Sequence, residues 1–526
     1  MQEFPSSRAV EQSGGSYPSP LTHTHKTYPA MSSKAPWGSR LAKESGFRAI
    51  VQSGRDTKLL CLQRFVRLYA YGASFLILAH FLSGLGFADE RIGLFMTLTL
   101  LGDVVISLAL TAVTDRVGRR RVLGAGAASL AMSGLVFAAS TNYWLLLFAS
   151  VVGVISPSGN EIGPFRAIEE SVLAQLTAKD QRSDIFAWYT LFGTAGAALG
   201  TLTCGWAVQL LEDKAHWSTS SAHRAVFVIY AVLGIVKLGL VWCLGPAVEV
   251  DAPETQYQEV ALELEDNPLM SDDDDDEDEA NTRPAPAAPP PPRPISSVAL
   301  VLQSFRDLVP YISPLSRSIL YRLLVLFSLD SFASGIASPS WLTYFFTTVH
   351  SLSPAALGTL FLATNLLATL SNLAALPMAR RLGPLRTMVF THLPSAVFLA
   401  LIALPPASPR GTPLAMTLLA LRACTQSMDQ APRQAFLAAA VLPAERTAVL
   451  GVVNITKTLA QAGGIGSSGV FAARKLWVLG LGGAGLMKAA YDLLMLWMFL
   501  GLKEREAEAT AAAAESRVDP GDPEEA

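Results

Sequence analysis

Long apolar stretches separated by short polar breaks fill the chain between residues 65 and 502. Twelve of these stretches are close to the roughly 20 residues that an α-helix needs to cross a bilayer. The first six cover 65–87, 91–113, 122–140, 143–163, 185–210 and 224–245, and the second six cover 317–348, 355–378, 387–405, 413–431, 447–471 and 477–502. Lipid offers the backbone no hydrogen-bond partners, so such segments must be helical. The pattern therefore predicts an all-α membrane protein with twelve transmembrane helices in two bundles of six.

The composition of the whole chain agrees with a membrane protein. Of its 526 residues, 51% are hydrophobic and 16% are charged, which is too apolar for a soluble protein of this length. The net charge of −3 gives no reason to expect binding to nucleic acid. The four cysteines have no metal-ligand spacing and no catalytic set is clustered, so we expect no metal, no cofactor and no enzyme. We expect a monomeric, multi-pass protein of the plasma membrane or the vacuolar membrane.

Three polar segments flank and separate the apolar blocks. The expected organisation is a disordered tail at 1–63, a first bundle at 64–246, a disordered linker at 247–316, a second bundle at 317–502 and a tail at 503–526. The linker combines an acidic run with a proline-rich tract, and neither favours a packed element. Short loops on one side of the membrane carry twelve lysines and arginines, against six on the other side. By the positive-inside rule, the first side faces the cytoplasm, together with both tails and the linker.

The two halves share a repeat with a nearly constant offset. Identical residues recur 265 positions after Gly93, Arg116, Gly118 and Arg121, and 264 positions after Arg182, Gly200 and Gly205. A constant offset through several regions indicates two related six-helix halves with pseudo-symmetry. Repeated membrane halves around a site at the middle of the bilayer are typical of secondary transporters.

The loop at 114–121, with the sequence Thr-Asp-Arg-Val-Gly-Arg-Arg-Arg, joins the second and third expected helices. Its glycine permits a tight turn, and its arginines favour the cytoplasmic side. A tight Asp-Arg-x-Gly-Arg-Arg turn at this place resembles the loop between helices two and three of the major facilitator superfamily. The resemblance covers 64–502 apart from the linker, and the chain looks most like fungal members with no assigned substrate. A simpler alternative is that the loop is only a positive-inside anchor without a gating role.

Ionisable residues inside membrane helices are costly unless they are paired or hydrated, so each is a candidate for function. The resemblance implies that helices 1, 4, 7 and 10 line a central cavity. The candidates for substrate or proton binding on these helices are Asp330, Arg422, His80 and Gln426. We expect Asp330 and Arg422 to face one cavity and to set the charge of the substrate. The alternative is a polar stripe that only joins neighbouring helices.

The resemblance also implies a set of ion pairs, here called the cytoplasmic latch, that closes the cytoplasmic side in the outward-facing state. Acids at the inner ends of helices 4 and 10 would pair with arginines near the inner ends of helices 11 and 5. The expected pairs are Glu161 with Arg446 and Asp429 with Arg182, assisted by the loop residues Asp115, Arg116, Gly118, Arg119 and Arg120. Partly exposed pairs contribute little each, so they can break during a transport cycle.

Two further ion pairs are predicted, one from depth together with the resemblance and one from spacing along a helix. Asp103 in the second helix and Lys457 in the eleventh lie at about the same depth, some 17 Å from the cytoplasmic ends at about 1.5 Å per residue. The resemblance places these helices face to face across the two halves, so we expect Asp103 to pair with Lys457. This pair would be either a fixed link or a contact that changes as the halves move. Lys488 and Asp492, four residues apart in the twelfth helix, are expected to form a structural pair.

The function that these features favour is secondary active transport of a small solute by alternating access. Proton coupling is left open, with Asp330 or His80 as the titrating group. The alternative is a nutrient-sensing receptor on a transporter scaffold that signals through its tails and linker. The expected partners are a small-molecule substrate, the lipid bilayer and, in the coupled case, protons.

Overall fold

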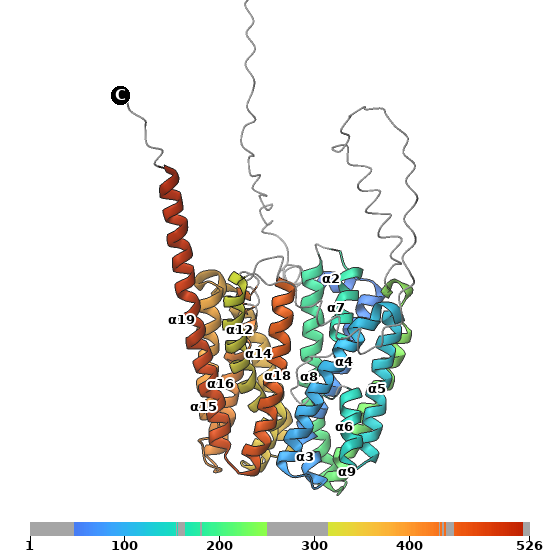
Figure 1. Ribbon diagram of the computed structural model, residues 1–526. Helices are drawn as coiled ribbons and strands as arrows, with labels where there is room; N and C mark the ends of the chain where they lie inside the picture. The colour runs from blue at the N-terminus through green and yellow to red at the C-terminus, as the bar shows by residue number, and fades with distance from the viewer. Residues whose placement is uncertain are drawn as a thin grey trace, which may run out of the picture.

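The computed structural model describes residues 47–153, 155, 164–178, 181–249, 314–430, 432–433, 436–437 and 446–518. In this part of the chain every regular element is a helix (Figure 1). The first half contains α2 (Phe47–Gln52), α3 (Arg55–Gly84), α4 (Asp89–Val117), α5 (Arg119–Ala139), α6 (Tyr143–Val152), α7 (Pro164–Leu176), α8 (Arg182–Asp213), α9 (Thr219–Trp242) and the 3₁₀-helix η1 (Pro246–Val248). The second half contains α12 (Pro314–Ile336), α13 (Pro339–Thr348), α14 (Pro354–Leu382), α15 (Pro384–Leu401), α16 (Gly411–Gln426), α18 (Arg446–Ala473) and α19 (Trp477–Val518). The predicted all-α membrane fold is confirmed, whereas most of the predicted N-terminal tail and the linker lie outside the described residues.

Seven of the described helical stretches are long and apolar enough to cross a membrane by themselves, among them α3, α9 and the first part of α19. Two other apolar helices, Tyr143–Val152 and Leu385–Leu401, are shorter. The chain is therefore a multi-pass membrane protein, and the exact count of twelve spans stays a prediction.

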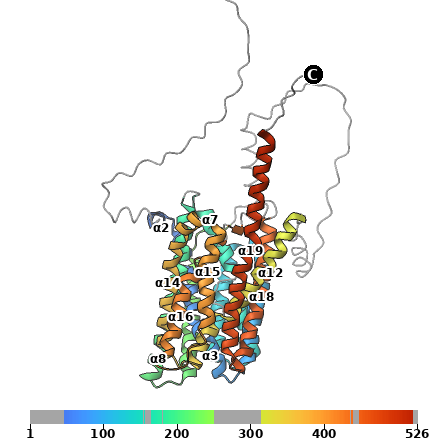
Figure 2. The same cartoon turned by 90° about the vertical axis from the view of Figure 1, so that its left-hand side faces the viewer.

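Several helices extend beyond their predicted ranges, and these extensions bring charges into the bundles. α3 begins at Arg55, ten residues before the predicted span, and a further helix, α7, lies at Pro164–Leu176, beyond the predicted end of the fourth span at residue 163. α19 continues to Val518, so its 42 residues make a helix roughly 63 Å long at about 1.5 Å per residue. Its end projects beyond the bundle, where a separate tail was expected from residue 503 (Figure 2).

The seventh span is divided into two helices. α12 ends at Ile336, and Pro339 opens α13 after an extended Ser338. A proline fits this place because the first N–H groups of a helix have no partner within the helix. The break lets α13 lie against α3 of the other half.

The two halves meet mainly where α4 packs against α18, α8 against α14 and α3 against α13. The internal repeat is visible at two of these contacts, because Gly93 meets Gly469 and the repeat-related Gly358 meets Gly205. A Cβ atom added to Gly93 would lie 3.0 Å from the Cα atom of Gly469. Glycine therefore permits the close approach of these helices, as small residues do in other membrane proteins.

The contacts between the halves lie toward one end of the molecule, here called the outer end. Tyr344 of α13 donates a hydrogen bond of 2.8 Å to Asp89, lies 3.3 Å from the hydroxyl of Ser83, and packs its ring 5.1 Å from that of His80. The opposite end, here called the tail end, carries α2 and the projecting end of α19 (Figure 1). Among the described residues, the hydrogen bonds and ring contacts between the halves all lie in the half of the spans nearer the outer end. The arginine distribution predicts that the tail end is cytoplasmic.

Candidate functional site

The first half contains a buried ion cluster that joins four helices. Arg67 of α3 donates two hydrogen bonds, of 2.9 and 2.7 Å, to the carboxylate of Glu169 in α7. The Tyr189 hydroxyl of α8 donates to the same carboxylate at 2.7 Å, and Nζ of Lys237 in α9 lies 3.4 Å from it. The side chains of Arg67 and Glu169 are only 1% and 0% exposed. These four residues are called the first cluster, and its carboxylate is stable at this depth because cations and donors surround it.

The second half contains a larger cluster around Asp330 of α12. Nζ of Lys488 in α19 lies 2.6 Å from Oδ1 of Asp330, and Nη1 of Arg433 lies 3.2 Å from Oδ2. Nδ1 of His392 in α15 lies 3.0 and 2.9 Å from the two carboxylate oxygens of Asp492 in α19. Nε2 of His392 lies 4.0 Å from Oδ1 of Asp330. These five residues are called the second cluster, and they tie α12, α15 and α19 to the segment after α16.

Further charged and aromatic side chains flank the second cluster. Arg433 also forms an ion pair with Asp429, and its guanidinium carbon lies 5.6 and 5.7 Å from the ring centroids of Phe327 and Tyr491. Nζ of Lys457 lies 5.4 Å from the ring centroid of Phe327. Aromatic faces attract cations, so this ring helps to hold two positive charges next to the cluster.

The two clusters occupy corresponding helices, with two of the charges reversed. Under the repeat, Arg67 of α3 corresponds to Asp330 of α12 at an offset of 263 residues, and Glu169 of α7 corresponds to Arg433 at an offset of 264. The lysines Lys237 and Lys488 lie in the corresponding sixth and twelfth helices, but their offset of 251 residues does not align them under the repeat. In both halves the lysine lies within ion-pair distance of the acid, although the acid belongs to a different helix. Each half therefore has a buried ion cluster in corresponding spans, and the charges at the two aligned positions are exchanged.

The residues predicted to bind substrate are separated in the structure. Asp330 is held by two cations of the second cluster and does not pair with Arg422. Arg422 in α16 is 6% exposed, and among the described residues its guanidinium forms no ion pair and donates no hydrogen bond. Gln426 is the exposed last residue of α16, and His80 lies beside Tyr344 toward the outer end. The substrate roles of all four residues stay predictions.

The cytoplasmic latch is not formed among the described residues. Asp429 binds Arg433 instead of Arg182, and Arg182 donates a 2.8 Å hydrogen bond to the carbonyl of Ala174 near the end of α7. Outside the described residues lie Glu161 and the side chains of Asp115, Arg116 and Arg446. The halves are joined toward the outer end, so their tail ends do not bring Asp429 and Arg182 together. The latch stays a prediction for the opposite conformation.

The loop at Gly118 is anchored within the first half. Gly118 has a φ of 99° and its repeat equivalent Gly383 has a φ of 78°, which is a backbone region that glycine tolerates without strain. The carboxylate of Glu249 accepts the backbone N–H groups of Arg119 at 2.7 Å and of Arg120 at 3.2 Å. These N–H groups open α5, where a negative charge is favourable. Glu249 therefore fixes the start of α5 behind the predicted gating loop.

The predicted pair of Lys488 with Asp492 is wrong. Lys488 binds Asp330 and the hydroxyl of Ser334, and Asp492 binds His392. The two residues are neighbours along α19, but they face α12 and α15 respectively, and each finds a closer partner there.

The predicted pair of Asp103 with Lys457 is not made in this conformation. α4 and α18 do pack against each other, and Asp103 is 5% exposed, but Lys457 lies over the ring of Phe327. A fixed link between the halves through these two residues is therefore absent. A contact that forms in another conformation stays a prediction.

The sequence reasoning missed the roles of Arg67, Glu169, His392 and Glu249. The predicted first span begins only two residues before Arg67, and the predicted fourth span ends six residues before Glu169, whereas α3 begins at Arg55 and α7 extends to Leu176. Buried apolar residues recur at helical spacing through 165–176, and this signal could have extended the fourth span to include Glu169. For His392, a lone histidine in an apolar helix gave no such signal.

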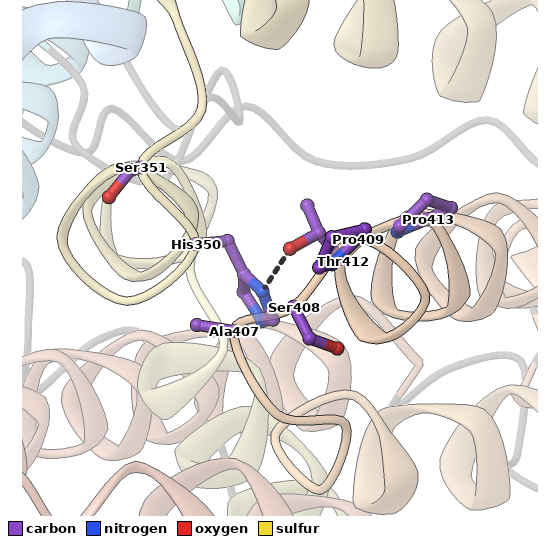
Figure 3. Close-up of a pocket in the computed structure, with 7 residues that line it drawn as sticks. All are labelled: His350, Ser351, Ala407, Ser408, Pro409, Thr412 and Pro413. Atoms are coloured by element: carbon purple, nitrogen blue, oxygen red, sulfur yellow. Dashed lines mark hydrogen bonds between the residues drawn. The ribbon is translucent and has the colours of Figure 1, made fainter.

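A separate pocket lies at the outer end, between the loop after α13 and the loop between α15 and α16 (Figure 3). Its volume is about 470 Å³, and its lining residues are His350, Ser351, Ala407, Ser408, Pro409, Thr412 and Pro413. Nδ1 of His350 lies 3.1 Å from the hydroxyl of Thr412, and burial lowers the pKa of the His350 imidazole. None of these residues belongs to either cluster, so we do not assign the solute site to this pocket.

Two repeated helical bundles that meet toward one end and carry buried charges define a class of membrane protein, the secondary transporters. Residues 60–329 match the family described as Major Facilitator Superfamily. The "Uncharacterized membrane protein YJR124C" of Saccharomyces cerevisiae is 36% identical over 456 residues, which cover 86% of this chain and 95% of that protein. The chain belongs to the major facilitator superfamily and is therefore assigned to a family of transporters, not of enzymes.

Solved structures share this fold. The nucleoside transporter NupG gives a TM-score of 0.57 at 15% identity and covers 85% of this chain and 99% of its own. The inward open xylose transporter XylE from E. coli gives 0.56 at 13% identity, covering 84% and 94%. A bacterial homologue of the human drug peptide transporters PepT1 and PepT2 gives 0.59 at 14% identity, covering 86% and 98%. At these identities the likeness concerns the fold alone.

Proposed function

We propose that this protein is a secondary active transporter that moves a small solute by alternating access. The observation that supports this most directly is the position of the contacts between the halves. They join α3 with α13, α4 with α18 and α8 with α14, toward the outer end. Two rigid halves joined at one end can rock so that a central site faces each side in turn. The conformation described here corresponds to the state that is closed at the outer end.

The two buried clusters support the rigid-body part of this proposal. The first cluster lies entirely within the first half, and the second lies entirely within the second half. Breaking a buried ion pair by removing one partner is strongly destabilising. Each cluster therefore holds its own helices together while the halves move relative to each other.

Arg422 supports a proposal about the charge of the solute. It lies in α16, which corresponds to the tenth helix, and its side chain is 6% exposed without an acidic partner among the described residues. A buried cation without a partner is costly. A carboxylate or phosphate group of a solute would offset this cost through two parallel hydrogen bonds to the guanidinium group. We therefore infer that the solute carries an anionic group.

Uptake into proteoliposomes tests both parts of the proposal. Labelled carboxylates, phosphate esters, neutral sugars and neutral nucleosides would be offered with and without a pH gradient. We expect an anionic solute to be taken up, and Arg422→Gln to lower its uptake about tenfold or more, since hydrogen bonds to charged groups contribute about 1.5–3 kcal/mol. Arg410→Gln, which precedes α16 in an outer loop, is the matched control and should keep wild-type uptake. Uptake of neutral solutes alone, or full uptake by Arg422→Gln, would contradict the anionic solute.

The second candidate function is a nutrient-sensing receptor, and the projecting end of α19 favours it. This helix leaves the bundle as a continuous rod that ends at Val518, which offers a surface for a partner (Figure 2). Truncation after residue 502 distinguishes the two functions. A transporter keeps its uptake without this segment. A receptor binds the solute in full-length and truncated forms without moving it across the membrane, and it loses its signal on truncation.

A further inference from the structure

His392 is held between two carboxylates inside the second half. Its Nδ1 lies 3.0 and 2.9 Å from the oxygens of Asp492, and its Nε2 lies 4.0 Å from Oδ1 of Asp330. The side chain of His392 is 2% exposed, that of Asp492 is 0% exposed and that of Asp330 is 5% exposed. The three residues come from α15, α19 and α12, so the imidazole bridges three helices of one bundle.

The same oxygen of Asp330 serves two groups. Oδ1 of Asp330 accepts a 2.6 Å hydrogen bond from Lys488, and Nε2 of His392 faces this oxygen from 4.0 Å. Lys488 has a second acceptor, the hydroxyl of Ser334 at 2.7 Å. A positive charge on His392 would therefore lie near the ammonium group of Lys488 and repel it, and Lys488 keeps the Ser334 hydroxyl as an acceptor.

The other charged groups around the cluster are accounted for. Arg433 binds Oδ2 of Asp330 and also Asp429, while Lys457 of α18 lies over Phe327. The ring of Tyr491 on α19 lies 6.0 Å from the imidazole of His392. The directly bonded groups are thus three carboxylates and two cations besides His392, and Lys457 is a third cation close to Asp330 and Asp429.

We propose that His392 is the proton-binding residue of this transporter and that its protonation loosens the bond between Lys488 and Asp330. This inference rests on the proposed transport function and adds the coupling ion and its site. In the resting form, the neutral imidazole donates its Nδ1–H to Asp492. A proton from water then binds the lone pair of Nε2 and gives an imidazolium between Asp492 and Asp330. The same proton leaves from Nε2 to water when the site faces the other side, so no other bond is broken.

Other histidines in the described spans lack this arrangement. His80 packs against Tyr344, and its buried Nε2 has no hydrogen-bond partner among the described residues. His223 is 5% exposed and lies near the start of α9. In the described part of the chain, an imidazole between two buried carboxylates occurs at His392 alone.

Nitrogen NMR of the full chain in lipid nanodiscs, labelled with ¹⁵N only in its seven histidines, tests the proton site without any solute. His392→Gln assigns the His392 signals by their loss. The pH is varied from 8.5 to 5. We expect the His392 signals to report the gain of a proton as the pH is lowered, and Asp492→Asn to make this protonation less favourable, because an opposite charge in contact favours the charged form. A His392 signal with one protonation state over this range, or an unchanged midpoint in Asp492→Asn, would overturn the proposal. If His392→Gln does not fold, His392→Asn provides the assignment.

Transport measurements separate this inference from the proposed function. With a solute from the proteoliposome panel, His392→Gln should lower accumulation driven by a pH gradient at least tenfold more than it lowers solute exchange at equal pH. His350→Gln, which changes the same residue type in the outer loop, should keep both activities. Full gradient-driven accumulation by His392→Gln removes the proton site but leaves the transporter. A His392 that titrates in a protein that transports no solute keeps the proton site and removes the transport function.

Discussion

Exchanging the charges of Arg67 and Glu169 tests whether the two buried clusters are equivalent. In the second half, α12 carries the acid Asp330, and Lys488 binds it. Arg433 occupies the position that corresponds to Glu169 and also binds Asp330. The double variant Arg67→Asp with Glu169→Arg recreates this arrangement in the first half. Lys237 then takes the part that Lys488 plays in the second cluster.

The expected size of the effect follows from the geometry. Arg67 and Glu169 lie 2.7 Å apart, so their attraction is roughly 6 kcal/mol at an effective dielectric constant of 20. Desolvation offsets much of this attraction, but removing one partner of a buried pair costs about 3–5 kcal/mol. Arg67→Asp places an aspartate beside Glu169. Glu169→Arg places an arginine beside Arg67 and Lys237, because Nζ of Lys237 lies 3.4 Å from the Glu169 carboxylate in the wild type. We expect each single variant to lose about 3–5 kcal/mol of unfolding free energy, and the double variant to recover more than half of that loss.

Unfolding of the purified protein in mixed detergent micelles, followed by tryptophan fluorescence, measures these differences. The control is the same exchange at Arg166 and Glu170, an ion pair within α7 whose side chains are 47% and 31% exposed. A surface pair of this kind contributes under about 1 kcal/mol, so both its single and double variants should stay close to the wild type. A double variant of the buried pair that is no more stable than its worse parent would refute the equivalence of the clusters.

Three other predictions concern the start of α5, the contact between the halves and the outer pocket. Glu249→Ala should lower the free energy of unfolding by about 0.5–2 kcal/mol because the first N–H groups of α5 lose their acceptor. Thermal unfolding measures this loss. A loss no larger than that of a distant surface Glu→Ala variant would contradict the prediction. Gly469→Val should block the approach of α18 to Gly93, since even a Cβ atom there would lie 2.9 Å from the Cα atom of Gly93. Cysteine crosslinking between α4 and α18 should therefore fall severalfold. The control Gly483→Val, where an added Cβ meets no atom within 4 Å, should leave the crosslinking unchanged. Burial lowers the pKa of His350, so the folded protein binds fewer protons at this residue than the unfolded chain does. The stability of the folded state is therefore unaffected by His350 above about pH 6.5 and falls as the pH is lowered further. His350→Gln should therefore show a smaller drop in melting temperature between pH 7.5 and 5.5 than the wild type, and an equal drop would disprove the assignment.

The sequence by itself determined the fold class and the relation between the halves. Apolar stretches of membrane length dictate helices because lipid leaves the backbone no other way to form its hydrogen bonds. The repeat offset placed Gly118 and Gly383 at equivalent positions, and likewise Gly93 with Gly358 and Gly205 with Gly469. The structure shows the first two in turns and the other four where helices of the two halves meet. These features follow from local rules: a positive φ or a close approach of two backbones requires glycine at one fixed position.

Only the tertiary structure decided which charges meet. Lys488 and Asp492 are neighbours on one helix, yet each binds a residue more than 90 positions away. Arg67 meets Glu169 because α7, beyond the predicted end of the fourth span, packs against α3. Asp330 meets Lys488 and Arg433 rather than Arg422. A residue's depth along a helix can be read from the sequence at a fixed rise per residue. Its partner depends on how each helix is rotated about its own axis and where it ends, and packing between helices far apart in the chain sets both.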